Sequence, residues 1–174
     1  YPDETIQHAG IVTGLGGYAG HSHKYKKKGG SGYLFRTSTV QDFSGVTGAC
    51  LLVKTAVYDE MHGLDEQFAV AFNDVDFCLR VRDAGYRIAW TPYAELIHYE
   101  SKSRGGDEKD PVKAARFAAE QQRLYTIHGK ENILDDPYYN PNLTRDREDF
   151  SESDDLRRLK EGRVTVRFRG GTLQ

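Results

Sequence analysis

The chain has 174 residues, of which 38% are hydrophobic, a length that suffices for one ordinary domain with a buried core but not for two. Its 24 lysine and arginine residues nearly balance 26 aspartate and glutamate residues, so the chain lacks the strong basic charge that nucleic-acid or anionic-membrane binding needs. We therefore expect a small-molecule partner and no nucleic acid.

The first third of the chain predicts little regular structure. Residues 5–14 mix apolar and β-branched residues and lead into a glycine-rich segment, LGGYAGHSHKYKKKGGSGYLF. We expect this segment to be a loop, because glycine weakens regular elements. Its lysines, Lys26, Lys27 and Lys28, either contact a phosphate or an acidic acceptor or simply form a solvated surface, and we favour the second.

The next segment predicts a buried strand followed by a short helix. Residues 46–54, VTGACLLVK, form a continuous apolar run flanked by glycine, which is typical of a strand buried on both faces. Residues 55–63 then predict a helix with Thr55 as its N-cap and Gly63 just past its end. The order of elements indicates an α/β fold.

Two carboxylates, Asp74 and Asp76, stand where an apolar run gives way to a helical pattern, in AFNDVDFCLR. That pattern ends at Gly85, where a glycine commonly follows a helix. A carboxylate in the first turn can cap free amides, worth roughly 0.3 to 1 kcal/mol, and the same position keeps it charged and ready to act as a general base. Metal binding would require further ligands, since a hard divalent ion takes about six oxygens.

The last part of the chain alternates extended and helical patterns. Residues 86–92 predict a strand stopped by a proline, and residues 94–101 continue in an extended pattern. An Asp-Pro signature opens a helix over residues 110–128. A turn-rich, charged segment at 135–155 should be irregular, and residues 163–170 predict an edge strand.

The two cysteines, Cys50 and Cys78, each lie inside an apolar run and not in a C-x-x-C pair, which is typical of reduced core thiols in a cytoplasmic protein. No window approaches the roughly 18 to 20 apolar residues of a transmembrane helix, and no signal-peptide pattern opens the chain. The chain begins at Tyr1 without an initiator methionine. We therefore expect a soluble piece of a longer protein.

A family resemblance rests on the long segment TGACLLVKTAVYDEMHGLDEQFAVAFNDVDFCLRVRDAGYRIAWTPYAELIHYES, preceded by QHAGIVTGLGGYAGHSHK and followed by DPYYNPNLTRDREDFS. In this order the segments resemble the C-terminal half of the catalytic domain of family 2 glycosyltransferases. These are inverting enzymes of GT-A fold and include rhamnosyltransferase-like proteins of cell-surface polysaccharide assembly. The resemblance covers nearly all of residues 5–150. It implies a truncated GT-A fold, with a mixed sheet flanked by helices, over residues 1–150 and a charged tail or linker over 151–174.

The resemblance assigns a catalytic base and an acceptor side. In the family, a G-L-D-E-x-F stretch precedes an acidic pair at a helix start, and the aspartate of that pair is the base. Asp74 matches it, with Asn73 where many relatives carry glutamate, so Asp74 should take the proton of an acceptor hydroxyl during inverting transfer. Asp76 should orient or cap and not bind a metal. Gly48 and Ala49 of TGAC, together with Asn73, should line the acceptor side.

The resemblance also implies a Mn²⁺ or Mg²⁺ cofactor. A histidine in an H-H-E-S-like segment of the family helps to hold the divalent ion on the diphosphate. His98 matches the first of those histidines, while Tyr99 stands at the second. Ser101, Ser103 and Arg104 follow at a position from which they would donate hydrogen bonds to the diphosphate.

The implied partners are a nucleotide-sugar donor and a carbohydrate or lipid-linked acceptor, met at the cytoplasmic face of the membrane, with peripheral membrane association of the longer protein. The family's nucleotide-binding half and its D-x-D motif would precede Tyr1, so this chain alone should not turn over substrate. A sheet without that half leaves an open edge, and we therefore expect self-association.

Two other hypotheses stay open. One is a carbohydrate- or nucleotide-binding module without catalysis; a D-x-D roughly 40 to 60 residues before Tyr1 would favour the enzyme instead, given the length of βα units. The other, which we favour less, is a histidine metal site built from His8, His21 and His23.

Overall fold

The computed structural model describes residues 1–99 and 110–153. Its helices are α1 (Thr55–Glu60), α2 (Asn73–Asp83), α3 (Pro111–His128) and α4 (Lys130–Leu134). Its strands are β1 (Ile11–Thr13), β2 (Ala19–His21), β3 (Gln41–Asp42) and β4 (Ala89–Trp90), and three 3-10 turns, η1 (Leu15–Gly17), η2 (Tyr33–Phe35) and η3 (Gly48–Cys50), join them. The fold class is mixed α/β, as the sequence predicts.

The strands form two separate antiparallel pairs. β1 pairs with β2, with Ile11 opposite His21, and β3 pairs with β4, with Gln41 opposite Trp90. The prediction of one mixed sheet is therefore wrong for the described residues. Each strand has only two or three residues, too few to extend a sheet beyond its one partner.

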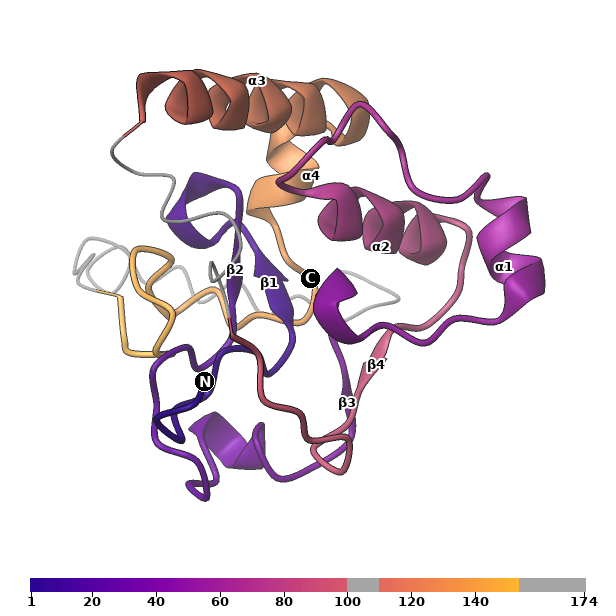
Figure 1. Ribbon diagram of the computed structural model, residues 1–174. Coiled ribbons are helices and arrows are strands. Elements are labelled where there is room, and N and C mark those ends of the chain that lie inside the picture. Colours follow the sequence, from indigo (N-terminus) through magenta and orange to yellow (C-terminus); the bar gives the residue numbers. More distant parts are fainter. Residues whose placement is uncertain (100–109, 154–174) are drawn as a thin grey trace, which may run out of the picture.

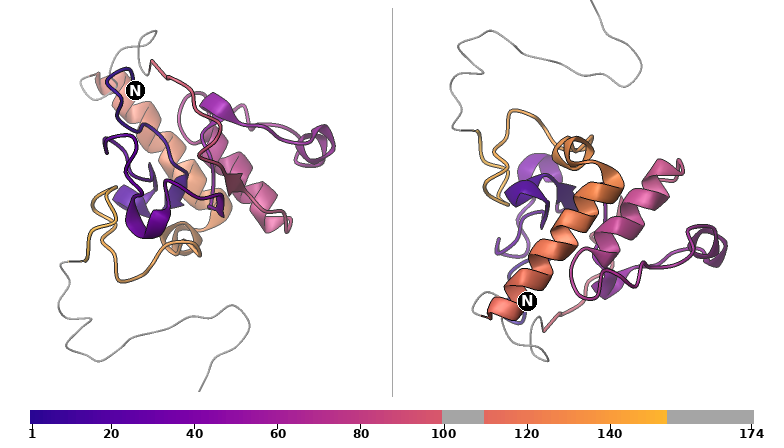
Figure 2. Two further views of the ribbon diagram at one scale, coloured as in Figure 1. Left: turned by 90° about the horizontal axis from the view of Figure 1, so that it is seen from below. Right: turned by 90° about the horizontal axis from the view of Figure 1, so that it is seen from above.

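Helix α2 lies at the centre of the packing, beside the longer α3 (Figures 1 and 2). Its Val75 and Leu79 join Leu124 of α3 in one apolar core. Its Phe77, Cys78 and Val81 enter a second core, which also contains Val57 of α1. Because α2 is buried on two sides, its first turn is held firmly in place.

Strand β1 lies between the apolar core of α2 and α3 and a third apolar core. Ile11 packs among the helices, whereas its neighbour Val12 faces the third core, as expected when side chains alternate along a strand. That third core also contains Tyr139, Leu143 and Phe150. The segment after α4 is irregular, as predicted, but it contributes these buried side chains and is more than a surface wrap.

The run at 46–54 is not the buried strand that its composition predicts. Residues 48–50 form η3, and Leu51 continues in an extended conformation without a strand partner. Leu52 is 98% exposed, and Cys50 is exposed whereas Cys78 is buried. Apolar composition favours burial, but a strand also needs a neighbouring strand to pair with. None of the described strands pairs with this segment.

The predicted helices agree well with the structure. Asp110 caps α3 by accepting a hydrogen bond from Val112 N at 2.9 Å. α2 ends before Gly85, whose φ of +89° is the left-handed conformation that glycine allows. Thr55 is the first residue of α1 and not its N-cap, which is Lys54.

The glycine-rich segment is only partly the loop that was predicted. It contains β2, η1 and η2. Lys26, Lys27 and Lys28 are exposed, as the favoured hypothesis expects, and Lys28 forms an ion pair with Glu95.

Part of the sequence-based interpretation concerns residues outside the described ranges. The predicted edge strand at 163–170 and most of the tail at 151–174 fall there. Among residues 1–99 and 110–153, no helix combines the length and apolar composition that a membrane span needs.

Candidate functional site

The first turn of α2 presents Asp74 in a fixed orientation. Phe72, immediately before the helix, has a φ of +63°, a left-handed conformation that is costly for a residue with a bulky side chain. Asp74 N donates to Asn73 Oδ1 at 2.7 Å, and Val75 N donates to Asp74 Oδ1 at 2.9 Å. The backbone therefore turns sharply at Phe72, two residues before the candidate base.

Asp74 also contacts the segment that was predicted to line the acceptor side. Gly48 N donates to Asp74 Oδ2 at 2.8 Å, and a Cβ added to Gly48 would lie 3.5 Å from Asp74 Cβ. Ala49 N follows at once and donates to Thr47 Oγ1 at 3.3 Å. The structure thus brings Gly48, Asn73 and Asp74 together, with Ala49 in the same turn.

Asp74 keeps the capacity to accept a proton. Each of its carboxylate oxygens accepts one backbone amide, from Val75 and from Gly48, which leaves further lone pairs on both. Its side chain is only partly buried, so an approaching hydroxyl can reach it.

The segment that holds Gly48 is fixed residue by residue. Ile11 N donates to Gly45 O at 2.8 Å. Val46 N lies 3.4 Å from Cys78 Sγ, and Thr47 N donates to His8 Nε2 at 3.3 Å. Gly45, Val46 and Thr47 therefore contact β1, α2 and the N-terminal segment in turn, and the next residue, Gly48, contacts Asp74.

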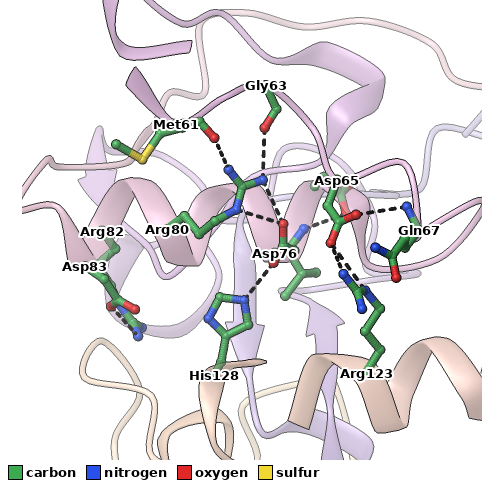
Figure 3. Close-up of polar contacts among 12 residues, drawn as sticks. Met61, Gly63, Asp65, Gln67, Asp76, Arg80, Arg82, Asp83, Arg123 and His128 are labelled. Carbon is green, nitrogen blue, oxygen red and sulfur yellow. Dashed lines mark hydrogen bonds and ion pairs between the residues drawn. The ribbon is translucent and has the colours of Figure 1, made fainter. Parts of the chain in front are cut away.

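Asp76 is a buried structural anion, as Figure 3 shows. Its side chain is 1% exposed, and it pairs with Arg80 at 2.7 Å and with His128 Nε2 at 2.9 Å. Burial opposes its ionisation, but the hydrogen bonds from His128 and Arg80 outweigh burial and lower the pKa of Asp76. Arg80 also donates to the carbonyls of Met61 and Gly63. Through these contacts Asp76 connects α2 to the C-terminal end of α3.

Two further carboxylates stabilise the approach to α2, and the sequence analysis missed both. Glu120 of α3 is 4% exposed and accepts Val70 N at 3.3 Å and Ala71 N at 2.6 Å. Asp65 pairs with Arg123 of α3 at 2.6 Å (Figure 3). Asp65 lies in the GLDEQF stretch that contributes to the family resemblance, whereas no sequence pattern distinguishes Glu120. Its partners lie about fifty positions away and carry no pattern of their own.

The histidines do not form the metal site considered from the sequence. His8 and His21 face each other, with 2.9 Å between their Nδ1 atoms. His23 lies elsewhere, stacked on Phe150 and accepting Tyr33 N at 3.0 Å. Across residues 1–99 and 110–153, no group of three or more histidine, cysteine or acidic side chains could hold a metal ion.

The predicted diphosphate side is described only in part. His98 is exposed and lies in an irregular segment after β4. Ser101, Ser103 and Arg104, which were expected to meet the diphosphate, lie outside the described residues.

Among known proteins similar to this chain, two have names that state a role, one in O-antigen biosynthesis and one in rhamnosyl transfer. The chain is 34% identical over 145 residues to the O-antigen biosynthesis protein RfbC of Myxococcus xanthus, which covers 83% of the chain. It is 32% identical over 80 residues, 46% of the chain, to N-acetylglucosaminyl-diphospho-decaprenol L-rhamnosyltransferase of Mycobacterium tuberculosis. It is 49% identical over 151 residues, 86% of the chain, to y4gI, an uncharacterized protein of Sinorhizobium fredii. Taken together, the named relatives point to glycosyltransferases.

These relatives are much longer than the part that matches. The aligned part spans 16% of the Sinorhizobium protein, 11% of the Myxococcus protein and 24% of the Mycobacterium protein. No protein-family model matches the chain, and no solved structure matches it.

Proposed function

We propose that this chain is the acceptor-side part of a glycosyltransferase of surface-polysaccharide synthesis. The longer protein would transfer a sugar from a nucleotide-diphosphate sugar to a hydroxyl group of a carbohydrate or lipid-linked acceptor. The named relatives support this class of reaction, and the geometry around Asp74 supports the role of this part of the chain.

The single observation that carries the proposal is the hydrogen bond of Asp74 to the Gly48 amide, at 2.8 Å on the first turn of α2. Asp74 would take the proton of the acceptor hydroxyl while that oxygen forms a bond to the anomeric carbon. The bond between that carbon and the diphosphate breaks on the opposite face, so the transfer inverts the anomeric centre. A well-placed base of this kind contributes on the order of 10² to 10⁴ in rate. A family 2 enzyme of GT-A fold would work in this way.

The local geometry favours Asp74 over Asp76 as the base. Asp76 is almost fully buried, and Arg80 and His128 already occupy its two oxygens. The hydrogen bonds from His128 and Arg80 lower the pKa of Asp76, so this carboxylate is a poor proton acceptor. Asp74 is bound only by backbone amides and is reachable from outside.

The acceptor would approach over the turn at 48–49. Gly48 and Ala49 are exposed, and the absence of a side chain at Gly48 leaves space directly beside Asp74. Asn73 precedes the base on the same turn and would hydrogen-bond an acceptor hydroxyl. A larger side chain at position 48 would fill the space that the acceptor needs.

A divalent cation, Mn²⁺ or Mg²⁺, remains part of the proposal. The described residues do not make a site for it, since His98 is exposed and belongs to no cluster of three candidate ligands. His98 would then provide one ligand, with the others from the diphosphate or other parts of the longer protein. Ser101, Ser103 and Arg104 are proposed to bind the diphosphate. The reaction would take place at the cytoplasmic face of the membrane, to which the longer protein would bind peripherally.

The decisive experiment is an Asp74→Asn substitution in the full-length protein. Transfer should fall by at least 100-fold while donor binding is retained, because asparagine keeps the shape of the side chain but cannot accept the proton. Asp59→Asn on the exposed face of α1 is the matched control and should leave transfer unchanged. Nucleotide-sugar turnover that persists in Asp74→Asn would refute the role of Asp74. Sugar or nucleotide binding without any transfer by the wild-type protein would indicate a binding module instead.

Calorimetric titration of this chain with UDP, GDP and dTDP, with and without Mn²⁺, tests whether the nucleotide site lies in this chain or in the remainder of the longer protein. We expect no binding, because the nucleotide site would lie in the remainder of the longer protein. Mn²⁺-dependent binding that disappears in His98→Ala would contradict that expectation and assign the diphosphate site to this chain.

A further inference from the structure

His8 makes three hydrogen bonds at the back of the Asp74 site. Its Nε2 lies 3.3 Å from Gly10 N and 3.3 Å from Thr47 N, and its Nδ1 lies 2.9 Å from His21 Nδ1. Both backbone amides are donors, so Nε2 must be the unprotonated, accepting nitrogen of the ring. The remaining proton of the neutral ring is then on Nδ1 and is donated to His21.

This arrangement fixes the tautomers of both histidines. His21 accepts on Nδ1 and therefore carries its own proton on Nε2. The backbone amide of His21 is held by Glu148 Oε1 at 3.1 Å, so the second ring is anchored on a different segment. His8 thus works as a fixed acceptor for Thr47 and Gly10.

The amide that His8 holds is adjacent to the amide that orients Asp74. Thr47 N donates to His8, and the next amide, Gly48 N, donates to Asp74 Oδ2 at 2.8 Å. Thr47 is extended, with φ −69° and ψ 140°, and its hydroxyl accepts the third amide in the row, Ala49 N. Without His8, the Thr47 amide loses its partner and the peptide planes of the turn are free to rotate. Rotation there changes the direction of the Gly48 N–H.

We propose that His8 is a positioning residue for the base. Supported by His21, it fixes the Thr47–Gly48 turn so that the Gly48 amide sets the orientation of the Asp74 carboxylate. The consequence for catalysis rests on the proposed function of Asp74, whereas the coupling between His8 and Gly48 does not. A small misplacement of a catalytic group is enough to cost about 100-fold in rate.

Two substitutions of His8 distinguish this positioning role from a general contribution to stability. Both introduce a side-chain amide, but the two side chains differ in length. In His8→Gln, the side-chain oxygen reaches the place of Nε2 and can accept Thr47 N again. In His8→Asn, the shorter side chain brings its oxygen only to the position of Nδ1, so this oxygen cannot accept the Thr47 amide. His62→Gln is the control, because His62 is exposed and carries no role here.

The first readout needs no activity. In amide-resolved NMR spectra of this chain, His8→Asn should shift the Gly48 amide and speed its hydrogen exchange, although residue 8 does not contact Gly48. His8→Gln should return both values towards the wild type, and His62→Gln should leave them unchanged. An unchanged Gly48 amide in His8→Asn would overturn the proposal.

The second readout is kinetic and uses the full-length protein. His8→Asn should lower kcat by 10-fold to 100-fold with KM for the acceptor changed less than threefold, and His8→Gln should recover most of kcat. Equal losses in the two variants, or a loss confined to KM, would overturn the positioning role. If Asp74→Asn keeps full activity while the Gly48 amide still responds to His8, the proposed function fails and the coupling stands.

Discussion

Two histidines, the partly buried His8 and the buried His23, should destabilise this fold in mild acid. Burial, with the neighbouring His21 ring adding to it, lowers the pKa of His8 to about 3. Burial, together with the nearby cations Arg36 and Lys26, lowers the pKa of His23 to about 4. His23 is 2% exposed and is stacked on Phe150 with 4.4 Å between ring centroids, so protonation there has no new partner to offset it.

The direction of the effect follows from the two states of each ring. In the unfolded chain a histidine titrates near 6.5, well above both folded values. Below pH 6.5 the unfolded chain therefore binds protons that the folded chain does not, and the free energy of unfolding falls as the pH falls towards 4 for His23 and 3 for His8. At pH 5 each ring accounts for a loss of roughly 2 kcal/mol. Two rings lose about 4 kcal/mol, a large part of the roughly 5 to 15 kcal/mol typical of a domain.

Urea unfolding at pH 7.5 and pH 5.0 measures this loss. The wild-type chain should lose about 4 kcal/mol between the two pH values, and His8→Gln or His23→Gln about 2 kcal/mol, because glutamine does not titrate. His62→Gln should behave like the wild type. Comparing pH differences cancels both the cost of each substitution at neutral pH and the titration of carboxylates common to all variants. A wild-type chain and a His23→Gln chain that lose the same free energy between these pH values would refute the reasoning.

Four other expectations concern the Asp76 ion pair, the Glu120 hydrogen bonds, the turn at Gly48 and the exposed Leu52. Asp76→Ala should cost about 3 kcal/mol in urea unfolding, since it leaves the partly buried Arg80 guanidinium and the buried His128 ring without their acceptor. Glu120→Ala should cost about 1 to 3 kcal/mol by the same measurement, because two amides before α2 lose their acceptor. Gly48→Ala should change stability by less than about 0.5 kcal/mol, because the new Cβ makes only an ordinary contact at 3.5 Å, yet it should raise the KM for the acceptor in the full-length protein. The chain should self-associate in sedimentation velocity, and Leu52→Glu, at a 98% exposed position, should weaken that association; a wild-type monomer at high concentration would contradict it.

The sequence predicts the helices of this fold well because their signals are local. The Asp-Pro start of α3 and the glycine after α2 act within one turn of the backbone, and the structure confirms both. The placement of Asp74 at the start of α2 belongs to the same class. Local signals therefore place Asp74 at the helix start, whereas its interpretation as a base comes from the family resemblance.

The strands and the buried ion pairs depend on partners that the sequence does not identify. The apolar run at 46–54 satisfies every composition rule for a core strand, but no described strand lies next to it. Asp76 meets His128 across 52 positions, and Glu120 meets Ala71 across 49. No periodicity in the chain encodes such distances, so these contacts could be found only from the folded arrangement.

Exposed apolar side chains lie close in sequence to the firmly held segment at 45–48 that contacts Asp74, and this contrast bears on what the site requires. From Gly45 to Gly48 each residue is tied to β1, α2 or His8, whereas four residues later Leu52 is almost fully exposed. Tyr93, Leu96 and Ile97 are exposed as well, at 82%, 66% and 63%. Exposed apolar groups that are close in sequence to a rigid polar site are typical of a surface that another protein part covers. Under the proposed function, we therefore expect the part of the longer protein that binds the donor to cover Leu52 and the described residues after β4.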